Sequence, residues 1–468
     1  MADGTPLVAR MDLAGFRRAF SWNGLRCVAD VMAVLVAVSL PWSTSATGIL
    51  TGLWLVALLP TLDVPSVRRV FAIAAGWLPA ALCALAVVGV LWADAPMAER
   101  LGGLKSFWRL LMIPLLLIQF QRSSRGVWVL VAYLAACAAL LIYSYILTVF
   151  PSLPHSAPGI GVPVKDYVVQ SGEFLICAFA LAHVALSQWR ERRPRFAIAS
   201  AILALAFLAN IAFVATGRTT VVVFCVLVVV FSIQRWSWKR AVAVSVIGAA
   251  LLAGALASSS YLRMRVLGVG EEIRRYETEN AETSTGFRLE FWKKSIGFFV
   301  ASPIIGHGTG STEELFRRAK VGTAGISSTV TGNPHSQFLL IAVELGIVGV
   351  ALMVAMWLAH GLLFRGDTLP AYLGLGIVVQ NVVASVFNAQ LFYFTPGWTY
   401  VFGVGVLGGM VLAAREKATR PANGPQKGGF GAWPGGKTPL RRRCRKPLQP
   451  RPGRAMTGAG RRPPAPFS

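Results

Sequence analysis

Three polar side chains stand out, because charged or titratable groups near a membrane surface are costly unless the protein uses them. Arg218 stands in Ala-Thr-Gly-Arg-Thr-Thr, Arg288 in Ser-Thr-Gly-Phe-Arg-Leu and His335 in Gly-Asn-Pro-His-Ser-Gln. An arginine offers a planar, always-charged group that can hold a phosphate through two hydrogen bonds. A histidine, whose ordinary pKa is about 6.5, can act as a general base near neutral pH. These residue types therefore predict anion binding and proton abstraction.

Each of these residues also has a plain structural explanation. Arg218 would reinforce the positive N-terminal end of a helix, but it could equally extend its side chain to the membrane surface. Arg288 could pair with the neighbouring Glu290, and spacing alone favours that pair. His335 could cap the apolar segment that follows it, or pack against it. The histidines that lack a comparable setting are His155, His183, His307 and His360.

Other motifs argue against a nucleotide, a metal or a cofactor. The Gly-His-Gly-Thr-Gly segment 306–310 lacks the preceding soluble strand and the following Lys-Ser/Thr of a phosphate-binding loop, so we interpret it as a structural turn. No acidic cluster with metal-ligand spacing lies near the three residues above. None of the six cysteines forms a Cys-X-X-Cys motif or a Cys/His cluster. We therefore expect no disulfide framework, no metal and no cofactor.

The composition indicates a membrane protein. The chain is 55% hydrophobic and 14% charged, whereas soluble domains contain roughly 25% charged residues. Apolar stretches long enough to cross a bilayer recur almost to residue 414. We predict an all-α polytopic membrane protein with about twelve transmembrane helices. Their expected spans are 28–42, 46–62, 70–92, 106–120, 127–149, 168–187, 196–215, 219–233, 238–258, 336–360, 369–388 and 396–414.

The short connections between these spans fall into two sets, and cytoplasmic connections are expected to carry the excess of Lys and Arg. The basic set comprises the segments 68–69, 122–125, 190–195, 235–240 and the region of Arg365. The nearly neutral set comprises 43–45, 150–167, the turn at Gly217 and 388–395. The two sets alternate along the chain, which predicts that both termini are cytoplasmic. The connection 93–105 has balanced charges and is compatible with the outer side.

The largest connection, 259–335, holds ten Lys/Arg and eight Glu, and the same alternation predicts that it lies outside. Its segments 271–279 and 287–299 have helical, amphipathic patterns. In the second segment, the apolar residues spaced to share one stripe are Phe287, Phe291, Ile296 and Phe299. We expect these helices to lie on the bilayer surface or to roof a cavity.

The pattern predicts a cytoplasmic N-terminal arm, nine transmembrane helices, a periplasmic loop domain, three further helices and a disordered cytoplasmic tail. These parts are 1–27, 28–258, 259–335, 336–414 and 415–468. The tail carries 14 Lys/Arg and one Glu, about half of the net charge of +25. It is rich in Pro and Gly and lacks apolar periodicity, which is typical of disorder. We therefore expect a solvated tail and membrane lipids as partners, and no nucleic acid.

Together the motifs resemble those of the O-antigen ligase and polymerase superfamily. They are Gly-Arg-Thr at 217–219, Phe-Arg-Leu at 287–289 followed by Phe-Trp, Ser-Pro-Ile-Ile-Gly-His-Gly-Thr-Gly from 302, and Asn-Pro-His-Ser-Gln-Phe-Leu before Glu-Leu-Gly-Ile-Val-Gly. The topology is similar over nearly the whole membrane region, and the motifs concentrate at about residues 205–350. Members often have Asn where Ser336 stands, a change that leaves His335 in place.

The resemblance implies a GT-C-like glycosyltransferase of the bacterial cell inner membrane with a periplasmic active site. It would transfer a preassembled glycan from undecaprenyl diphosphate to a hydroxyl of the lipid A core oligosaccharide, with inversion and without a metal. The resemblance assigns diphosphate binding and leaving-group stabilisation to Arg218 and Arg288, and the role of general base to His335. Gln337 or Asn333 would orient this histidine.

Other functions are compatible with the same motifs. An O-antigen polymerase would use a lipid-linked repeat unit as acceptor, and a protein O-oligosaccharyltransferase would use a Ser or Thr side chain. The single outer loop, without an added soluble domain, favours a ligase. A transporter or flippase for the lipid-linked glycan should show internal repeats and charges near the bilayer midplane. The mid-span residues Asp30 and Glu173 form no repeated pattern, and only the motifs argue against a scaffold.

Overall fold

The computed structural model describes residues 22–322 and 325–419. These residues form helices joined by turns, and no strand occurs among them. The protein is an all-α polytopic membrane protein, as its composition predicted. The predicted N-terminal arm is described only from Trp22, and the predicted basic tail only as far as Thr419, so the expectations for the rest of both lie outside the described residues.

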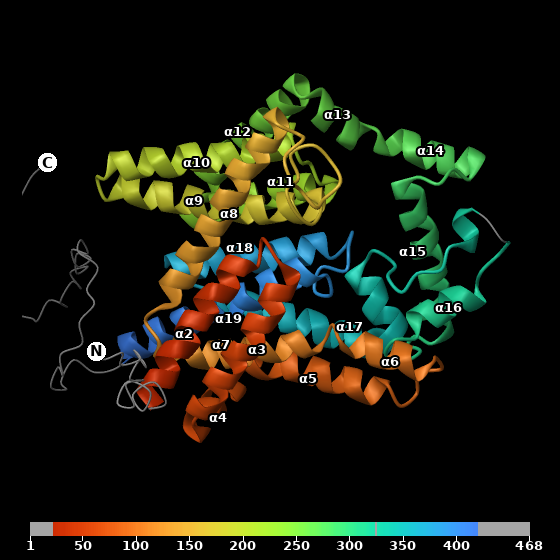
Figure 1. The fold of residues 1–468 in the computed structure, drawn as a ribbon, viewed down its shortest axis with the longest axis horizontal. Coiled ribbons are helices and arrows are strands. Elements are labelled where there is room, and N and C mark those ends of the chain that lie inside the picture. Colours follow the sequence, from red (N-terminus) through yellow and green to blue (C-terminus); the bar gives the residue numbers. More distant parts are fainter. Residues whose placement is uncertain (1–21, 323–324, 420–468) are drawn as a thin grey trace, which may run out of the picture. The chain divides into compact units, whose positions relative to one another are not determined.

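Every apolar segment predicted from the sequence carries a helix (Figure 1). Within the described ranges, ten helical stretches are long and apolar enough to cross a membrane. They are α2 (Trp22–Ser39), α3 with η1 (Thr44–Leu58 and Leu59–Thr61), α6 to α7 with η2 between them (Met97–Leu104, Trp108–Leu111 and Met112–Arg122), α8 (Gly126–Val149), α9 (Tyr167–Arg190), α10 (Pro194–Phe213), α11 (Arg218–Arg235), α12 (Trp238–Ser258), α17 (Gln337–Leu363) and α19 (Phe394–Thr419).

Two of the predicted spans differ from a simple crossing helix. The span expected at 70–92 is part of a bent pair, α4 (Val64–Phe71) and α5 (Ala74–Gly89), which meet at 86°. Close to the bend, a Cβ atom on Gly76 would lie 2.0 Å from the carbonyl oxygen of Val70, so only glycine fits there. The span expected at 369–388 is α18 (Leu369–Ala384), which has only 16 residues. The helices thus supply ten spans, or eleven with the bent pair, and a total of twelve stays a prediction.

Helix α17 is broken where a segment of the large connection packs against it. Gly346 has φ 64° and ψ −162°, and a Cβ atom there would lie 2.2 Å from the carbonyl oxygen of Ile304. The freed N–H of Ile347 donates to the carbonyl oxygen of Pro303 at 2.9 Å. Gly308 in turn approaches Ala93 so closely that its Cβ would lie 2.4 Å from the Cα of that residue. The Gly-rich segment 306–310 is therefore a structural turn that fits between two other parts of the chain.

The two predicted sets of connections gather at different ends of the helices. In the nearly neutral set, Lys165 donates to the carbonyl oxygen of Leu40, and the backbone N–H of Gln337 donates to Ser385. We call this the His335 end. In the basic set, the contacts that join one connection to another are Arg122 to Asp63, Arg190 to the carbonyl of Arg235, and Arg415 to the carbonyls of Leu363 and Arg365. We call this the Asp30 end, because Arg125 there pairs with Asp30.

The large connection forms four α-helices at the His335 end (Figure 1). They are α13 (Ser260–Leu267), α14 (Val269–Glu279), α15 (Ser284–Ala301) and α16 (Thr312–Arg318), and a short η3 (Ile326–Ser328) follows. Helix α15 begins after Thr283, whose hydroxyl accepts a hydrogen bond from Gly286. Its packed face includes Phe291 and Phe298, which both contact Phe316. Ile296, expected on the apolar stripe, is instead 52% exposed.

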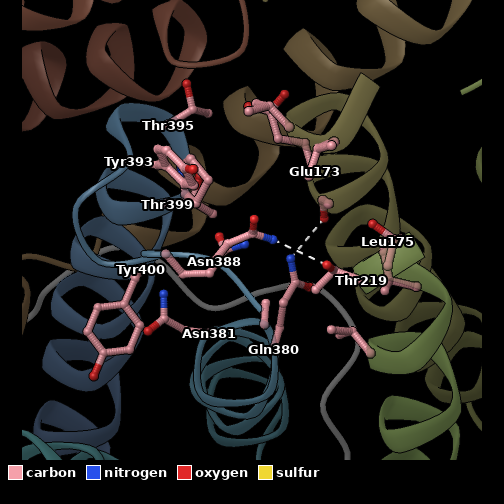
Figure 2. A pocket seen from close by; sticks show the side chains of 18 of the residues that line it. Glu173, Leu175, Thr219, Gln380, Asn381, Asn388, Tyr393, Thr395, Thr399 and Tyr400 are labelled. Atoms are coloured by element: carbon pink, nitrogen blue, oxygen red, sulfur yellow. Dashed lines mark hydrogen bonds between the residues drawn. The ribbon is translucent and has the colours of Figure 1, made fainter. Parts of the chain in front are cut away.

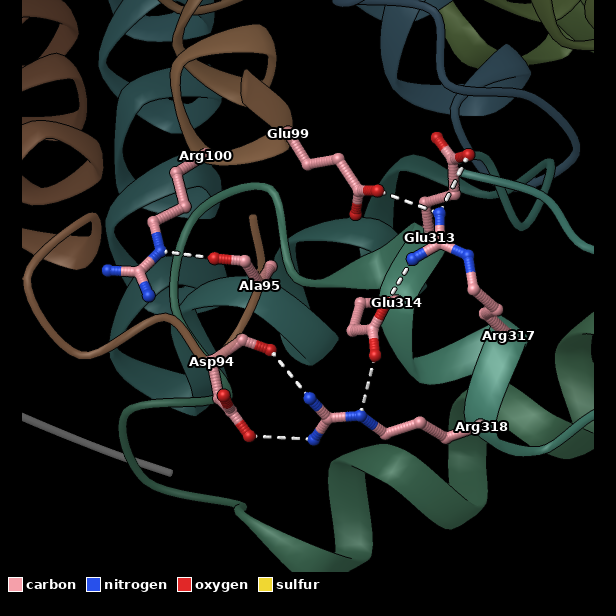
Figure 3. Close-up of polar contacts among 8 residues, drawn as sticks. All are labelled: Asp94, Ala95, Glu99, Arg100, Glu313, Glu314, Arg317 and Arg318. Atoms are coloured by element: carbon pink, nitrogen blue, oxygen red, sulfur yellow. Dashed lines mark hydrogen bonds and ion pairs between the residues drawn. The ribbon is translucent and has the colours of Figure 1, made fainter. Parts of the chain in front are cut away.

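Ion pairs tie α16 to the connection 93–105 (Figure 3). Arg318 donates to a carboxylate oxygen of Asp94 at 2.7 Å, and Arg317 donates to Glu99 at 2.7 Å. Both arginines also contact Glu314 on their own helix. The connection 93–105, whose balanced charges left its side open, therefore lies at the same end as the large connection.

Candidate functional site

A cavity of about 520 Å³ opens at the His335 end among α9, α11, α18 and α19. Its rim carries Lys165, Asp166 and Tyr167 from the connection 150–167 and the start of α9. Deeper in, the walls combine apolar side chains with amides and hydroxyls, several of which are seen in Figure 2. A site with polar groups at its mouth and a mainly apolar body suits an amphiphilic ligand.

Two of the three predicted catalytic residues line this cavity, and the third lies beside it. Arg288 comes from α15 and His335 from the turn before α17. Arg218 is the first residue of α11, and the next two residues, Thr219 and Thr220, are in the cavity wall. The charge of Arg218 acts on Arg288, and that of Arg288 acts on His335. The fold therefore brings together residues that lie 117 positions apart in the sequence.

The backbone of His335 has an unusual conformation for this residue type. Its φ is 54°, in the left-handed region that costs energy for any residue but glycine. Its N–H donates to the side-chain oxygen of Asn333 at 2.9 Å, and its ring stacks on Phe291, with 6.1 Å between ring centroids. His335 does not cap α17, because the hydroxyl of Ser336 does so by accepting from Leu339. In this conformation His335 lines the cavity.

One ring nitrogen of His335 is held and the other has no partner among the described residues. Nδ1 lies 3.1 Å from the hydroxyl of Tyr393. If Nδ1 carries the proton and donates it to that hydroxyl, the lone pair is on Nε2, where a base needs it. Burial lowers the pKa of His335, and the charge of Arg288 lowers it further. The ring is therefore expected to be neutral at pH 7 and able to accept a proton.

The two supporting residues predicted from the sequence, Asn333 and Gln337, fix different parts of the site. Asn333 fixes the backbone of His335, as described above, and its side chain also interacts with Tyr393. Gln337 does not contact the histidine ring through a hydrogen bond among the described residues. Its side-chain oxygen accepts from the backbone N–H of Leu391 at 3.0 Å. Gln337 therefore fixes the turn 388–393, which carries Tyr393, and acts on the histidine only through that turn.

Arg288 lacks the partner that spacing favoured for it. Glu290 instead accepts from the hydroxyl of Tyr276 at 2.9 Å and lies 3.5 Å from the ammonium of Lys294. No described residue forms a hydrogen bond or an ion pair with the guanidinium of Arg288. Burial lowers its pKa, and the nearby charge of Arg218 lowers it further. A partly buried, unpaired cation beside a second cation is a site prepared for an anion.

Arg218, in contrast, already has anionic and neutral partners. Both of its terminal nitrogens donate to Glu272 on α14, one of them at 2.9 Å. It also donates to the hydroxyl of Thr285 at 3.1 Å and to the carbonyl of Arg265 at 2.8 Å. The hydrogen bonds from Arg218, together with those from Thr285, hold the pKa of Glu272 down at about 2. Arg218 therefore ties α11 to the large connection, and its guanidinium is not extended freely to the membrane surface.

Sequence reasoning missed the residues that complete the wall of the cavity. Tyr393 was not singled out, because a tyrosine at the edge of an apolar segment has no distinguishing neighbour in the sequence. Gln380 and Asn381, two adjacent amides inside the apolar segment 369–388, were a signal that could have been used. Among the described residues, no three His, Cys, Asp or Glu side chains gather as they would around a metal ion.

The family comparison matches the part of the chain that carries the predicted residues. Residues 203–354 match the model of the O-antigen ligase family. This segment is similar to the O-antigen ligase family. The O-antigen ligase segment runs from within α10 to within α17 and contains Arg218, Arg288 and His335. The family is one of glycan-transferring enzymes of the O-antigen ligase and polymerase type, and no curated protein matches the chain.

Proposed function

We propose that the protein is an O-antigen ligase. In this proposal it transfers a preassembled glycan from undecaprenyl diphosphate to a hydroxyl of the lipid A core oligosaccharide, at the periplasmic face of the bacterial inner membrane. The observation that carries the proposal is that one cavity is lined both by Arg288, whose guanidinium has no partner among the described residues, and by His335. The match of residues 203–354 to the O-antigen ligase family supports it.

Arg288 would bind the diphosphate of the donor. When the bond between the anomeric carbon and the phosphate oxygen breaks, that oxygen keeps the electron pair and gains negative charge. A guanidinium positioned beside it stabilises the transition state more than the ground state. Because Arg288 has no competing partner among the described residues, it is available without first breaking an ion pair.

His335 would take the proton of the acceptor hydroxyl at Nε2. The hydroxyl oxygen attacks the anomeric carbon from the side opposite the diphosphate, so the configuration inverts. The products are the glycosylated acceptor, undecaprenyl diphosphate and a proton left on the histidine. Tyr393 and Asn333 would position the ring, the first through Nδ1 and the second through the backbone. None of these steps needs a metal ion or a cofactor.

Arg218 would contribute to the anion site in a second way. Its charge acts on Arg288 already, but its direct donors are held by Glu272 and Thr285. Direct contact with the diphosphate therefore requires Arg218 to exchange Glu272 for the substrate. Such an exchange of one anion for another keeps the arginine paired throughout.

The sidedness of the site belongs to the same proposal. The basic connections gather at the Asp30 end, which we assign to the cytoplasm together with both termini. The His335 end, with the helices α13 to α16, then faces the periplasm. A GT-C-like arrangement follows, with a lipid-linked donor entering a cavity between transmembrane helices and a loop domain above it.

The test starts from the purified full chain in lipid nanodiscs, supplied with a glycan on undecaprenyl diphosphate and with lipid A core. We expect glycosylated lipid A core to form, and a deletion strain to contain unmodified core together with accumulated lipid-linked polymer. A core carrying one repeat unit would indicate a polymerase instead. Glycan movement across sealed vesicles without any acceptor would identify a flippase, and either result would overturn the ligase proposal.

A further inference from the structure

The cavity has a group of oxygen atoms that no hydrogen bond satisfies. Both carboxylate oxygens of Glu173, the side-chain oxygen of Gln380 and that of Asn381 are buried without a hydrogen-bond partner in the described part of the chain. All three residues line the cavity, and Glu173 and Asn381 are only 4% and 5% exposed. We call these oxygens the acceptor cluster. Every member can accept a hydrogen bond.

The acceptor cluster comes from two neighbouring helices that line the cavity, α9 with Glu173 and α18 with Gln380 and Asn381 (Figure 2). The amide nitrogen of Gln380, on α18, donates to the carbonyl of Gly172 on α9 at 3.0 Å. This bond identifies which terminal atom of the Gln380 amide is the nitrogen, and it leaves the amide oxygen without a partner among the described residues. Glu173 follows Gly172 directly, so the carboxylate lies on the same helix as the contact.

Two other buried acids, Asp30 and Glu344, accept hydrogen bonds from the protein, whereas Glu173 has no donor among the described residues. At the Asp30 end, one oxygen of Asp30 accepts from Gln119 at 2.9 Å and the other from Ser123 at 2.8 Å. Glu344, another buried acid, accepts from the hydroxyl of Thr312. A buried acceptor without a donor costs about 1–3 kcal/mol. Several together in one cavity indicate a ligand that supplies donors.

We propose that the acceptor cluster binds the hydroxyl groups of the donor's first sugar unit, the one joined to the diphosphate. This inference rests on the proposed function. A hydroxyl-rich ring supplies several donors at once, whereas the isoprenoid chain of the carrier lipid supplies none. Glu173 lies six residues along α9 from Tyr167 at the rim, or about 9 Å by helix geometry. A sugar attached to a diphosphate at the rim therefore reaches it.

The test compares two probes on the full chain in nanodiscs: undecaprenyl diphosphate alone, and undecaprenyl diphosphate carrying one N-acetylhexosamine. The variants are Glu173→Gln and Asn381→Leu, which keep the volume of each side chain nearly unchanged. We expect each variant to bind the sugar-bearing probe about tenfold more weakly than the unmodified protein, the effect of one lost hydrogen bond. Binding of the bare carrier should stay unchanged. Asp30→Asn, a buried acid at the other end, should alter neither affinity.

The outcomes separate this inference from the proposed function. If both variants bind the two probes as the unmodified protein does, the cluster holds only water and the inference is wrong, while transfer by the unmodified protein still supports the function. If both probes weaken equally, the cluster binds the carrier. Lipid A core is measured as a third ligand, and if only its affinity falls, the cluster binds the acceptor's sugar, which also overturns the inference. A failure of the unmodified protein to bind either probe or to transfer glycan counts against the function itself.

Discussion

The two ends of the helices each contain a cavity, and the cavities differ in how their polar groups are balanced. The cavity at the Asp30 end, of about 260 Å³, is lined by Asp30, Gln119, Arg122 and Arg125. There Arg122 pairs with Asp63, and Asp30 accepts from Gln119. The larger cavity, at the His335 end, contains an arginine and a cluster of oxygens that have no hydrogen-bond partner within residues 22–322 and 325–419.

This difference separates polar groups that stabilise a fold from polar groups that await a ligand. Burying a charge costs free energy unless it is paired, and burying an acceptor costs free energy unless a donor reaches it. In the cavity at the Asp30 end, the protein itself supplies the partners: Trp54 donates to Gln119, and Gln119 donates to Asp30. At the His335 end a substrate must supply them.

Replacing the proposed base should have the largest effect. His335→Ala is expected to lower kcat about 10²- to 10⁴-fold, the usual contribution of general acid–base catalysis. Initial rates of glycan transfer in nanodiscs measure this. Asp30→Asn serves as the control from the other end and should keep the rate per folded molecule. Equal losses in both variants would mean that the two ends do not differ as described.

Replacing Arg288, which has no partner among the described residues, should have the second-largest effect on kcat. Arg288→Gln is expected to lower kcat about 10²- to 10³-fold, the effect of losing one stabilising donor to a developing negative charge. The thermal midpoint should stay equal or rise slightly, because a partly buried charge without a partner disappears. Rate and Tm measured on the same preparation check this. A large fall in Tm would show that Arg288 stabilises the fold instead.

At the Asp30 end, removing a charged side chain should lower stability, the opposite of the effect on Tm expected for Arg288→Gln. Asp30→Ala leaves Gln119 and Ser123 without their acceptor and should destabilise the protein by about 1–3 kcal/mol. The measurement is the Tm in detergent, with the transfer rate scored per folded molecule. Unchanged stability together with a lost rate would reverse the roles assigned to the two ends.

Removing the carboxylate partner of Arg218 should strengthen anion binding at the His335 end. Glu272→Gln removes the carboxylate that holds Arg218, so binding of undecaprenyl diphosphate should tighten by roughly three- to tenfold. The matched control is Glu271→Gln on the same helix, which breaks only the exposed pair with Arg274. The folded-state pKa of Glu272, about 2, lies below its ordinary 4.5, so its stabilising pair is fully present above pH 4.5 and is lost as the pH falls toward 2. Weaker binding by Glu272→Gln would show that the pair positions Arg218 for the substrate.

The smallest effect concerns the titration of His335. Because burial and the charge of Arg288 lower its pKa, the acid limb of the kcat/KM profile should have its midpoint below the ordinary value of 6.5. Activity should therefore fall as the pH drops through that midpoint and the imidazole becomes charged. In Arg288→Gln the midpoint, followed by NMR of the histidine ring against a His335→Ala blank, should move upward. A downward movement would exclude a positive neighbour.

The helices and the three central residues could be predicted from the sequence because their signals are local. Apolar length marks a span, and the segment with Gly217 and Arg218 is visible as a polar break between two spans. The break of α17 at Gly346 could not be predicted, since it depends on the backbone of Ile304, which is distant in the sequence. The same holds for the 86° bend between α4 and α5, because the sequence placed residues 68–69 in a connection and predicted no helix there.

The hydrogen-bond and ion-pair partners of the site residues could not be predicted from sequence spacing. Spacing favoured a pair between Arg288 and Glu290, but Glu290 turns to Tyr276 and Lys294. The pair of Arg218 with Glu272 joins residues 54 positions apart, and Tyr393 reaches His335 across 58. Such contacts depend on how the helices pack. The roles that the family resemblance assigns to Arg218, Arg288 and His335 stay predictions until the variants above are measured.

The left-handed backbone conformation at His335 lowers the stability of the protein at a position where the proposed reaction needs the imidazole. Its φ of 54° costs about 1 kcal/mol or more, a cost that glycine would not incur and that asparagine tolerates better. Selection for thermal robustness alone would therefore favour another residue at this position. A screen for more stable variants should return substitutions of His335, and these should be the variants that no longer transfer glycan.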